Sequence, residues 1–483
     1  MLVIKDDILR FRCYFVFLNQ NKGTKMIAAD CLFQTRPVVA IVGAGSLNWG
    51  RSIVVDLISH PDLADAEIRL IDILEDRLAL VHEWCEFARQ RMGKAQVITA
   101  HSDLREGLTG ATACLSAIAV GGDRLWRYDA THPQLDGIFQ PVGDSTGPGG
   151  AIRALRHAPA MRKIGLTLAE VGRPGALLLQ LTNPLNALTA CLDNIPGIRV
   201  VGFCHGYDDT EKKIAHTLFS GTYPPELFQG QRWRKELPRV RVELAGNNHF
   251  VFADKIQIGD RIYGQSEIHE LTPHLFDGPF REAVWSRFGA YVGNNTRHPI
   301  EFLPDFITPR SRYGRDWGVE PVAGEINPLN GERHDNSRAY LEAALANARK
   351  DFGSTEQWPL DHSREPLDDI VAAFHTGRRV DIHLNLRNRG ALKGLSDDLH
   401  LEMYCRIENG EIIRPDVTLP EKVIREVERV GQCQLHLAAC CEQFDEERLM
   451  EALRPDVLMP ADEDVRRRLI REMIEFQKPL IFA

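Results

Sequence analysis

A β-branched run followed at once by glycines is the feature that most restricts what this chain can fold into. The run is Pro37–Val42, PVVAIV; the turn GAGS follows it, and residues 51–59 then take up helical spacing. A strand, a glycine turn and a helix in this order are typical of a dinucleotide-binding fold, where the backbone approaches the pyrophosphate closely. Asn48 stands where the third glycine of that pattern belongs, and Gly50 follows two residues later. The residues predicted to bind the dinucleotide are Gly43, Gly45 and Ser46.

The next predicted strand ends on an acidic residue. It is Glu67–Ile71, EIRLI, and Asp72 follows it directly. A carboxylate about 20–30 positions beyond the glycines accepts a hydrogen bond from the ribose 2′-hydroxyl, which favours NAD over NADP. The alternative is that Asp72 caps a helix that begins near Leu74.

Three more apolar runs continue an alternation of strands and helices, and polar or glycine-rich residues follow each of them. The runs are Thr112–Val120, Ala176–Leu181 and Val200–Phe203. The alternation predicts an α/β fold with a doubly wound parallel sheet, whose ligands bind at the carboxyl ends of the strands. Cys204 and His205 follow the last run. Taken alone, this pair fits a core cysteine beside a partly buried histidine better than it fits a site.

Five short motifs together resemble the NAD- and divalent-metal-dependent glycosidases, which form family 4 of the glycoside hydrolases. The resemblance runs from Val38 to about Pro479. The motifs are GAGS at Gly43–Ser46, TGPGG at Thr146–Gly150, TNP at Thr182–Pro184, CHG at Cys204–Gly206 and GNNH at Gly246–His249. Their combination is specific, although GAGS and TNP mean little on their own.

The resemblance implies a Rossmann-like domain, related to that of lactate and malate dehydrogenases, followed by an α+β domain for substrate binding and oligomerisation. On this division residues 1–35 are an N-terminal extension that could be disordered, residues 36–206 bind NAD, and residues 207–483 form the second domain. The resemblance also implies a homodimer or a homotetramer.

It further implies hydrolysis of α-glycosides by an unusual route. Members of the family oxidise the sugar C3 hydroxyl with tightly bound NAD⁺, so that a base can remove the proton on C2. The leaving group is then eliminated across C1–C2, water adds, and the hydride returns. This family is an exception to glycoside hydrolysis by two carboxylates. The expected metal is Mn²⁺, which would stabilise negative charge on the sugar oxygens.

The site residues that the resemblance implies gather around this metal. Cys204 and His249 match the family's metal ligands. Asn183 matches the asparagine that binds substrate hydroxyls near the metal and the nicotinamide. Asp144 stands where relatives carry a proposed general acid, and the alternative is an aspartate that caps a turn.

The base that removes the C2 proton is expected in the segment Phe288–Phe306. Tyr291 is the predicted base, with its pKa lowered by the metal, and Asp305 is the alternative. His205 completes the predicted catalytic residues because it could approach the sugar ring.

The CHG triplet resembles the members of the family that cleave uronides, which are α-glucuronidases and α-galacturonidases. A uronate carboxylate needs cationic or amide partners, and a guanidinium can bind it with two hydrogen bonds. The candidates are Arg297, His298 and Asn294–Asn295. Arg297 fits an exposed loop charge equally well, and neutral α-glucosides or α-galactosides stay open as substrates.

The composition of the chain argues against a nucleic-acid-binding protein and against a membrane protein. The net charge is −9 and no basic block stands out, so a nucleic-acid partner is not expected. No apolar run approaches the roughly 18–20 residues of a membrane span. The ten cysteines do not form a spaced framework, which indicates reduced thiols and a cytoplasmic location.

Two other functions fit parts of the sequence. One is a 2-hydroxy-acid dehydrogenase on the same fold, which would release NADH and leaves Cys204 without a role. The other is a catalytically idle NAD-binding protein that senses redox state through Cys204, and it would bind NAD without metal-dependent turnover.

Overall fold

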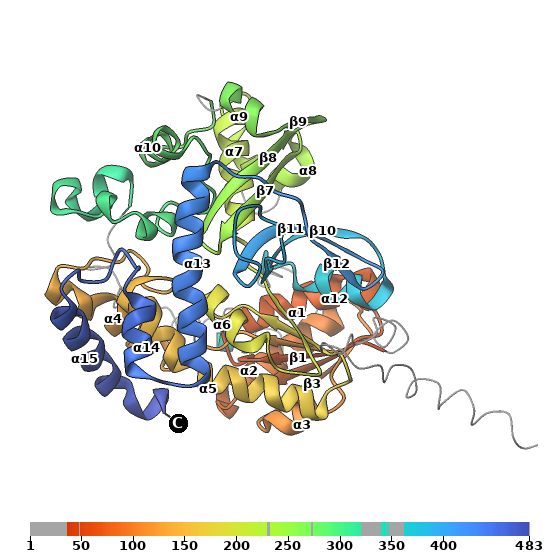
Figure 1. Ribbon diagram of the computed structural model, residues 1–483. Helices are drawn as coiled ribbons and strands as arrows, with labels where there is room; N and C mark the ends of the chain where they lie inside the picture. The colour runs from red at the N-terminus through yellow and green to blue at the C-terminus, as the bar shows by residue number, and fades with distance from the viewer. Residues whose placement is uncertain are drawn as a thin grey trace, which may run out of the picture.

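The described residues form one continuous sheet of 12 strands (Figure 1). The computed structural model describes residues 36–47, 49–228, 232–271, 274–319, 339, 341–343, 345–346 and 362–482. The predicted N-terminal extension, residues 1–35, lies outside the described residues. Within those residues, no helix is long and apolar enough to cross a membrane.

Six parallel strands form the first half of the sheet. Their order is β3-β2-β1-β4-β5-β6, and each neighbouring pair is parallel. This is the strand order of the dinucleotide-binding Rossmann fold, so the predicted doubly wound sheet is confirmed. The strands are β1 (Val38–Val42), β2 (Glu67–Ile71), β3 (Val97–His101), β4 (Ala113–Ser116), β5 (Leu177–Gln180) and β6 (Arg199–Gly202).

Alternate residues of β1 point into two different cores. Val39 and Ile41 pack in one apolar cluster with α1 and α2, whereas Ala40 and Val42 pack in another with α5. A strand that is apolar at every position is expected where helices cover both faces of a parallel sheet. The helices of this half are α1 (Trp49–Ser59), α2 (Glu75–Arg91), α3 (Leu104–Leu108), α4 (Gly122–Thr131), α5 (Gly147–Val171) and α6 (Leu185–Leu192).

The second half of the sheet is antiparallel and joins the first half at β6. Gly202 of β6 pairs with Asn385 of β10, and the order continues β11-β7-β8-β9, with β12 beside β11. A Cβ atom on Gly202 would lie 2.9 Å from the Cβ of Asn385, so glycine lets the two strands approach. The sheet therefore crosses the predicted domain boundary at residue 206. The strands are β7 (Val240–Asn247), β8 (Phe250–Ile258), β9 (Arg261–Tyr263), β10 (Val380–Arg387), β11 (His400–Glu408) and β12 (Glu411–Ile413).

The C-terminal helices return to the first half of the chain. The long helix α13 contacts α5 and α6, and α15 contacts α5 (Figure 1). Their apolar residues share a core cluster with α5. The other helices described are α7 (Gly206–Phe219), α8 (Arg232–Glu236), α9 (Gln265–Leu271), α10 (Pro279–Phe288), α12 (Leu367–Thr376), α13 (Glu421–Glu442), α14 (Glu446–Leu453) and α15 (Glu463–Ile481).

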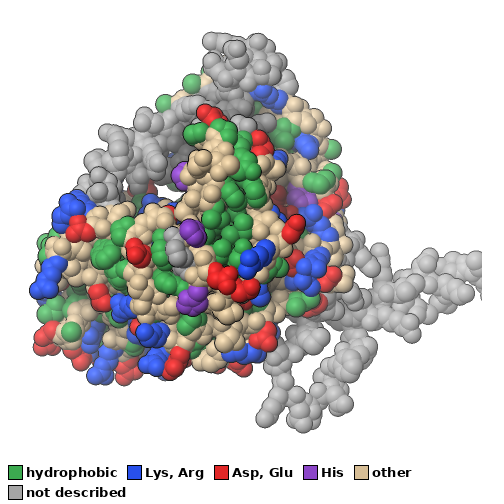
Figure 2. Space-filling model, turned by 90° about the horizontal axis from the view of Figure 1, so that it is seen from above, with side chains coloured by type: hydrophobic (Ala, Val, Ile, Leu, Met, Phe, Trp, Pro, Cys, Tyr) green, Lys and Arg blue, Asp and Glu red, His purple; other side chains and the backbone are tan. Residues whose placement is uncertain are grey.

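Charged side chains of both signs lie side by side on the face of the molecule that Figure 2 shows. This mixture matches the sequence, in which 58 Lys and Arg residues accompany 67 Asp and Glu residues. Opposite charges at short spacing largely cancel each other's field at a distance.

Glu301 ties the second half of the chain to the loop before α5. It lies in a short 3₁₀ turn, η6 (Pro299–Phe302), and is 1% exposed. One oxygen of its carboxylate accepts hydrogen bonds from the backbone N–H groups of Val142 and Gly143, at 2.5 and 2.8 Å. Burial, with a smaller effect of nearby Asp144, raises the pKa of Glu301 to about 8 from an ordinary value of 4.5.

This shift predicts that Glu301 makes the free energy of unfolding fall as the pH rises from 4.5 to about 8. In that window the folded protein holds a proton on Glu301 that the unfolded chain has released. The stability that this proton gives to the folded state is therefore complete below the unfolded pKa, and it is lost as the pH rises through the folded pKa. The slope is at most about 1.4 kcal/mol per pH unit.

Glu301→Gln should remove this slope, which urea unfolding at about pH 6 and about pH 8 would measure. Glu282→Gln is the matched control, because Glu282 is exposed on α10. The control should keep the wild-type slope. An unchanged slope in Glu301→Gln would show that Glu301 is not the titrating group.

Candidate active site

A cavity of about 1150 Å³ lies at the carboxyl ends of the parallel strands. Residues that follow β1, β2, β4, β5 and β6 line it, so these strand ends face one crevice as the sequence predicts. The predicted site residues that line it are Gly43, Gly45, Ser46, Asp72, Asn183, Cys204, His205, His249, Arg297 and His298.

The glycine turn after β1 brings three segments of backbone close together. The N–H of Gly43 donates to the carbonyl of Ile71 at 2.9 Å. A Cβ atom on Gly45 would lie 2.8 Å from the carboxyl carbon of Asp72, and one on Gly50 would lie 2.2 Å from the carbonyl oxygen of Ala44. Gly50 therefore allows the close packing of α1 on the turn that the third glycine of the usual pattern provides.

Asp72 holds this turn and also faces the cavity. One of its carboxylate oxygens accepts from the N–H of Gly45 at 2.8 Å, and the other accepts from the N–H of Leu74 at 2.9 Å. Asp72 thus contacts the backbone just before α2, as the helix-cap alternative expects, and it also lies at the cavity, where a carboxylate that binds a ribose is expected. Each carboxylate oxygen has a second lone pair that could accept a further hydrogen bond.

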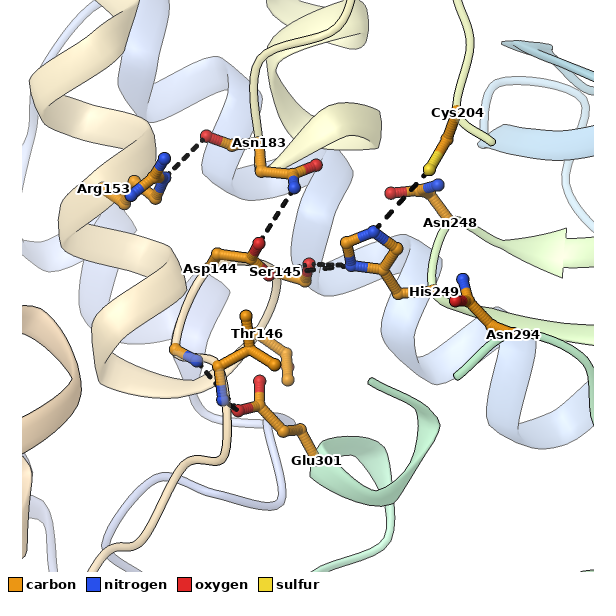
Figure 3. A network of polar contacts seen from close by, with 12 residues as sticks. Asp144, Ser145, Thr146, Arg153, Asn183, Cys204, Asn248, His249, Asn294 and Glu301 are labelled. Atoms are coloured by element: carbon orange, nitrogen blue, oxygen red, sulfur yellow. Dashed lines mark hydrogen bonds and ion pairs between the residues drawn. The ribbon is translucent and has the colours of Figure 1, made fainter. Parts of the chain in front are cut away.

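Cys204 and His249 approach each other from two different strands (Figure 3). Cys204 follows β6, and His249 lies in the tight turn between β7 and β8 with a φ of 69°. This left-handed conformation is unfavourable for a residue other than glycine and is often found at functional sites. Nε2 of His249 lies 3.9 Å from Sγ of Cys204, and its Nδ1 lies 2.6 Å from the hydroxyl of Ser145.

Asp144 is held as a charged carboxylate beside His249. It accepts hydrogen bonds from the hydroxyl of Ser145 at 2.7 Å and from the amide of Asn183 at 2.9 Å. Burial alone would raise the pKa of Asp144, but the imidazole of His249, whose Nδ1 lies 3.6 Å from the carboxylate, and the charge of Arg153 hold it well below its ordinary value. A proton donor needs the opposite shift, so the local charges do not support the predicted general-acid role.

His298 lies against His249, with ring centres 4.0 Å apart. Burial holds the pKa of His298 well below its ordinary value, so the ring is neutral. Its Nδ1 atom is buried and has no hydrogen-bond partner within the described part of the chain. Asp144, His249 and His298 each offer one ligand atom, and these atoms lie within 4.8 Å of one another. A carboxylate and two imidazoles, with the sulfur of Cys204 nearby, fit a divalent transition-metal ion.

The thiol of Cys204 does not ionise readily in these surroundings. Burial, with the charges of Glu402 and Glu365, raises its pKa well above the ordinary value. Asn248, whose amide donates to Glu402 at 2.7 Å, lies beside the sulfur (Figure 3). A thiolate at this position therefore needs a cation beside it.

The structure does not bring the two predicted bases to the cavity. Tyr291 is 1% exposed, packs in an apolar cluster, and donates from its hydroxyl to the carbonyl of Leu275 at 3.4 Å. Burial raises its pKa to about 12. Asp305 is exposed and pairs with Arg287 at 2.6 Å. From the same segment, the cavity is lined instead by Asn294, Asn295, Arg297 and His298.

Two lining residues were missed from the sequence. Glu365 is buried, and its carboxylate is hydrogen bonded to Nδ1 of His205. Burial would lower the pKa of His205, but Glu365 raises it above the ordinary value. Arg153 donates from Nε to the carbonyl of Asn183 at 3.2 Å. Arg153 lies one turn after the TGPGG motif, and this position could have indicated a site residue from the sequence. No motif surrounds Glu365.

Two family models match the chain. Family 4 glycosyl hydrolase matches residues 38–220, and the family 4 glycosyl hydrolase C-terminal domain matches residues 244–459. Among its relatives, an alpha-galactosidase of Rhizobium meliloti (strain 1021) is 26% identical over 393 residues, which covers 79% of this chain and 76% of the relative. An alpha-galacturonidase of Thermoanaerobacterium saccharolyticum is 23% identical over 468 residues, which covers 91% of this chain and 95% of the relative.

Solved structures share the fold. A putative glucosidase from Bacillus subtilis superposes with a TM-score of 0.75 at 22% identity, covering 91% of this chain and 99% of that one. A 6-phospho-alpha-glucosidase from gut microorganisms, solved in complex with NAD and Mn²⁺, gives a TM-score of 0.72 at 16% identity, covering 92% of this chain and 99% of that one. Since the two family models together span most of its length, the chain belongs to family 4 of the glycosyl hydrolases.

Proposed function

We propose that the protein hydrolyses α-D-galacturonides or α-D-glucuronides, with NAD⁺ and a divalent ion, Mn²⁺, as cofactors. The observation that carries this proposal is that one cavity joins the glycine turn and Asp72 to His249 and His298, which form a cluster with Asp144. The names of relatives support it, since they include alpha-galacturonidases and an alpha-galactosidase. Related structures that contain NAD and Mn²⁺ support the cofactors.

NAD⁺ bound at the glycine turn would supply a reversible acceptor for the hydride on the sugar C3. In this proposal the backbone at Gly43 and Gly45 approaches the pyrophosphate, and Ser46 lies at the start of the turn into α1. Asp72 offers its remaining lone pairs to the ribose hydroxyls.

A divalent ion held by Cys204, His249, His298 and Asp144 would supply positive charge beside the sugar C2 and C3 oxygens. The charged state of Asp144 suits it to this role better than to proton donation. His298, which the sequence assigns to the substrate carboxylate, is here proposed as a ligand because one of its ring nitrogens lies in the cluster. Its buried Nδ1 also has no hydrogen-bond partner among the described residues. Cys204 must stay reduced, since an oxidised sulfur would not bind the ion.

Asn183 and His205 are the proposed groups for orienting the sugar and moving its proton. The side-chain amide of Asn183 donates to Asp144, and the backbone carbonyl of Asn183 accepts from Arg153, so both ends of the residue are restrained. His205 lines the cavity with Nδ1 held by Glu365, so we assign removal of the C2 proton to its imidazole. Tyr291 is not assigned this step because its hydroxyl contacts Leu275 inside an apolar cluster.

The cationic lining supports an acidic sugar. Arg153 and Arg297 both line the cavity, and the side chain of Arg153 points toward the backbone carbonyl of Asn183 (Figure 3). A guanidinium binds a carboxylate with two parallel hydrogen bonds, which a neutral sugar cannot offer. A neutral α-galactoside is the second candidate, and the name of the Rhizobium meliloti relative favours it.

We expect the protein to release nitrophenol from p-nitrophenyl α-galacturonide or α-glucuronide only when Mn²⁺, NAD⁺ and a thiol reductant are all present. Absorbance would follow nitrophenol and NADH together, with each additive withheld in turn and neutral α-glycosides beside the uronides. Net NADH should stay near zero because the hydride returns to the product. Stoichiometric NADH with no glycoside cleavage would point instead to a dehydrogenase, and activity on neutral glycosides alone would reject the uronide assignment.

Cys204→Ser should weaken Mn²⁺ binding at least about tenfold, because a neutral hydroxyl brings no negative charge to the ion, whereas a thiolate does. Electron paramagnetic resonance of free Mn²⁺ measures the affinity without any substrate. Cys441→Ser is the matched control, since Cys441 is a partly exposed thiol on α13 outside the cavity. Equal affinities in the two variants would remove Cys204 from the metal site.

Tyr291→Phe should leave kcat within about twofold of the wild type, whereas His205→Asn should lower kcat by about 10²–10⁴-fold, as loss of a general base does. The phenylalanine keeps the packing of the ring and removes the hydroxyl, which donates to the carbonyl of Leu275. The measurement is steady-state turnover of the preferred nitrophenyl glycoside. A loss of a hundredfold or more in Tyr291→Phe would restore Tyr291 as the base.

A further inference from the structure

Residues 362–365, which we call the anchored segment, are fixed to α1 by a buried carboxylate. Asp56 of α1 is 5% exposed. One of its oxygens lies 2.5 Å from Nδ1 of His362, and the other accepts from the N–H of Ser363 at 3.0 Å and from its hydroxyl at 2.5 Å. Three contacts on one carboxylate leave the segment little freedom to shift relative to α1.

The rest of the segment is held just as closely. The hydroxyl oxygen of Ser363 accepts from the N–H of Glu365 at 3.0 Å. Arg364 between them has a φ of 69°, a left-handed conformation that a residue with a Cβ adopts only under constraint. Its guanidinium pairs with Asp209 at 2.8 Å and with Asp208 at 3.4 Å, both on α7. The segment therefore bridges α1 and α7.

This bridging directs one carboxylate at the cavity. Glu365 is 3% exposed, and it lines the cavity together with Arg364 and His205. One of its oxygens is hydrogen bonded to Nδ1 of His205, and the other has no hydrogen-bond partner among the residues described. A buried carboxylate is costly unless it is paired, so its place beside a cavity imidazole needs a reason beyond packing.

We infer that Glu365 is a positioning residue that fixes the ring of His205 in the cavity, and that Asp56 fixes Glu365 through Ser363. The inference rests on the proposed function where it takes His205 to act on the sugar. A carboxylate on one imidazole nitrogen sets the tautomer and the orientation of the ring.

The same contacts connect the two ends of the cavity. Asp56 belongs to α1, the helix that starts at the glycine turn, and the anchored segment ends at the carboxylate beside His205. The position of His205 relative to the dinucleotide turn is thus set by one short chain of hydrogen bonds. A substitution on α1 at Asp56 should reach the cavity although Asp56 does not line it.

The test uses the full chain labelled with ¹⁵N-histidine and the variants Glu365→Gln, Glu365→Ala, Asp56→Asn and Ser363→Ala. Asp193→Asn is the matched control, because Asp193 also pairs with a buried histidine, accepting from His400 at 3.2 Å, and does not line the cavity. The His205 ring signals are assigned by their loss in His205→Asn. We expect them to shift in the Glu365 and Asp56 variants and to stay in place in Asp193→Asn.

Turnover of the preferred nitrophenyl glycoside gives the second measurement. We expect kcat to fall about 10–100-fold in Glu365→Gln and by less in Ser363→Ala, with KM changed less than about threefold. Added formate should restore part of kcat in Glu365→Ala, because it can fill the place of the lost carboxylate. Asp193→Asn should keep the wild-type kcat.

Unmoved His205 signals in both Glu365→Gln and Ser363→Ala would overturn the inference. So would shifted signals with wild-type kcat, or a loss of kcat that matches a loss of folding stability and that formate does not restore. If Asp56→Asn does not fold, Ser363→Ala decides the link to α1. If the wild-type protein cleaves no glycoside, the proposed function fails, and the histidine spectra still decide whether Glu365 and Asp56 fix His205.

Discussion

The arrangement of the site depends most on the hydrogen bonds that hold the buried Asp144 carboxylate. Ser145 donates to one of its oxygens and Asn183 to the other, at 2.7 and 2.9 Å. The same Ser145 hydroxyl lies 2.6 Å from Nδ1 of His249. A buried carboxylate without donors would strongly destabilise the fold. Asp144 therefore holds three segments together, namely the start of α5, the end of β5 and the β7–β8 turn. Every ligand proposed for the metal lies at or beside this meeting point.

The continuous sheet is what allows such a meeting between distant parts of the chain. Gly202 of β6 pairs with Asn385 of β10, which pairs with Glu402 of β11, which pairs with Gly246 of β7. Cys204 leaves the sheet just after one end of this row, and His249 turns just after the other. Glycine at both ends removes side chains where the strands need close approach. The division into a nucleotide domain and a substrate domain therefore describes the order of the sequence better than it describes the sheet.

The sequence predicted those parts of the fold and site that depend on a pattern of neighbouring residues. A glycine turn after a β-branched run identified the dinucleotide end, and polar residues after apolar runs identified the edge of the cavity. Tyr291 shows the limit, because a pattern cannot tell whether a side chain near a site points into it or into the core behind it. Glu365 shows another, since its contact with His205 spans 160 residues and depends on how a loop is anchored to α1. His298 lines the cavity as predicted, and its short distance from His249 is the reason why we propose it as a metal ligand instead of a partner of the substrate carboxylate.

The lining of the cavity also separates a glycosidase from a dehydrogenase on the same fold. A 2-hydroxy acid is bound and oxidised with one cation for its carboxylate and one histidine for its hydroxyl proton. This cavity adds Cys204, His249 and His298, with the carboxylate of Asp144 beside them, and it also offers the amides of Asn183 and Asn294. Alternating donors and acceptors of this kind suit a ligand with several hydroxyls, each of which both donates and accepts. A cation held by this cluster would stabilise negative charge on two adjacent sugar oxygens, a charge that the proposed removal of the C2 proton creates and that oxidation of a 2-hydroxy acid does not.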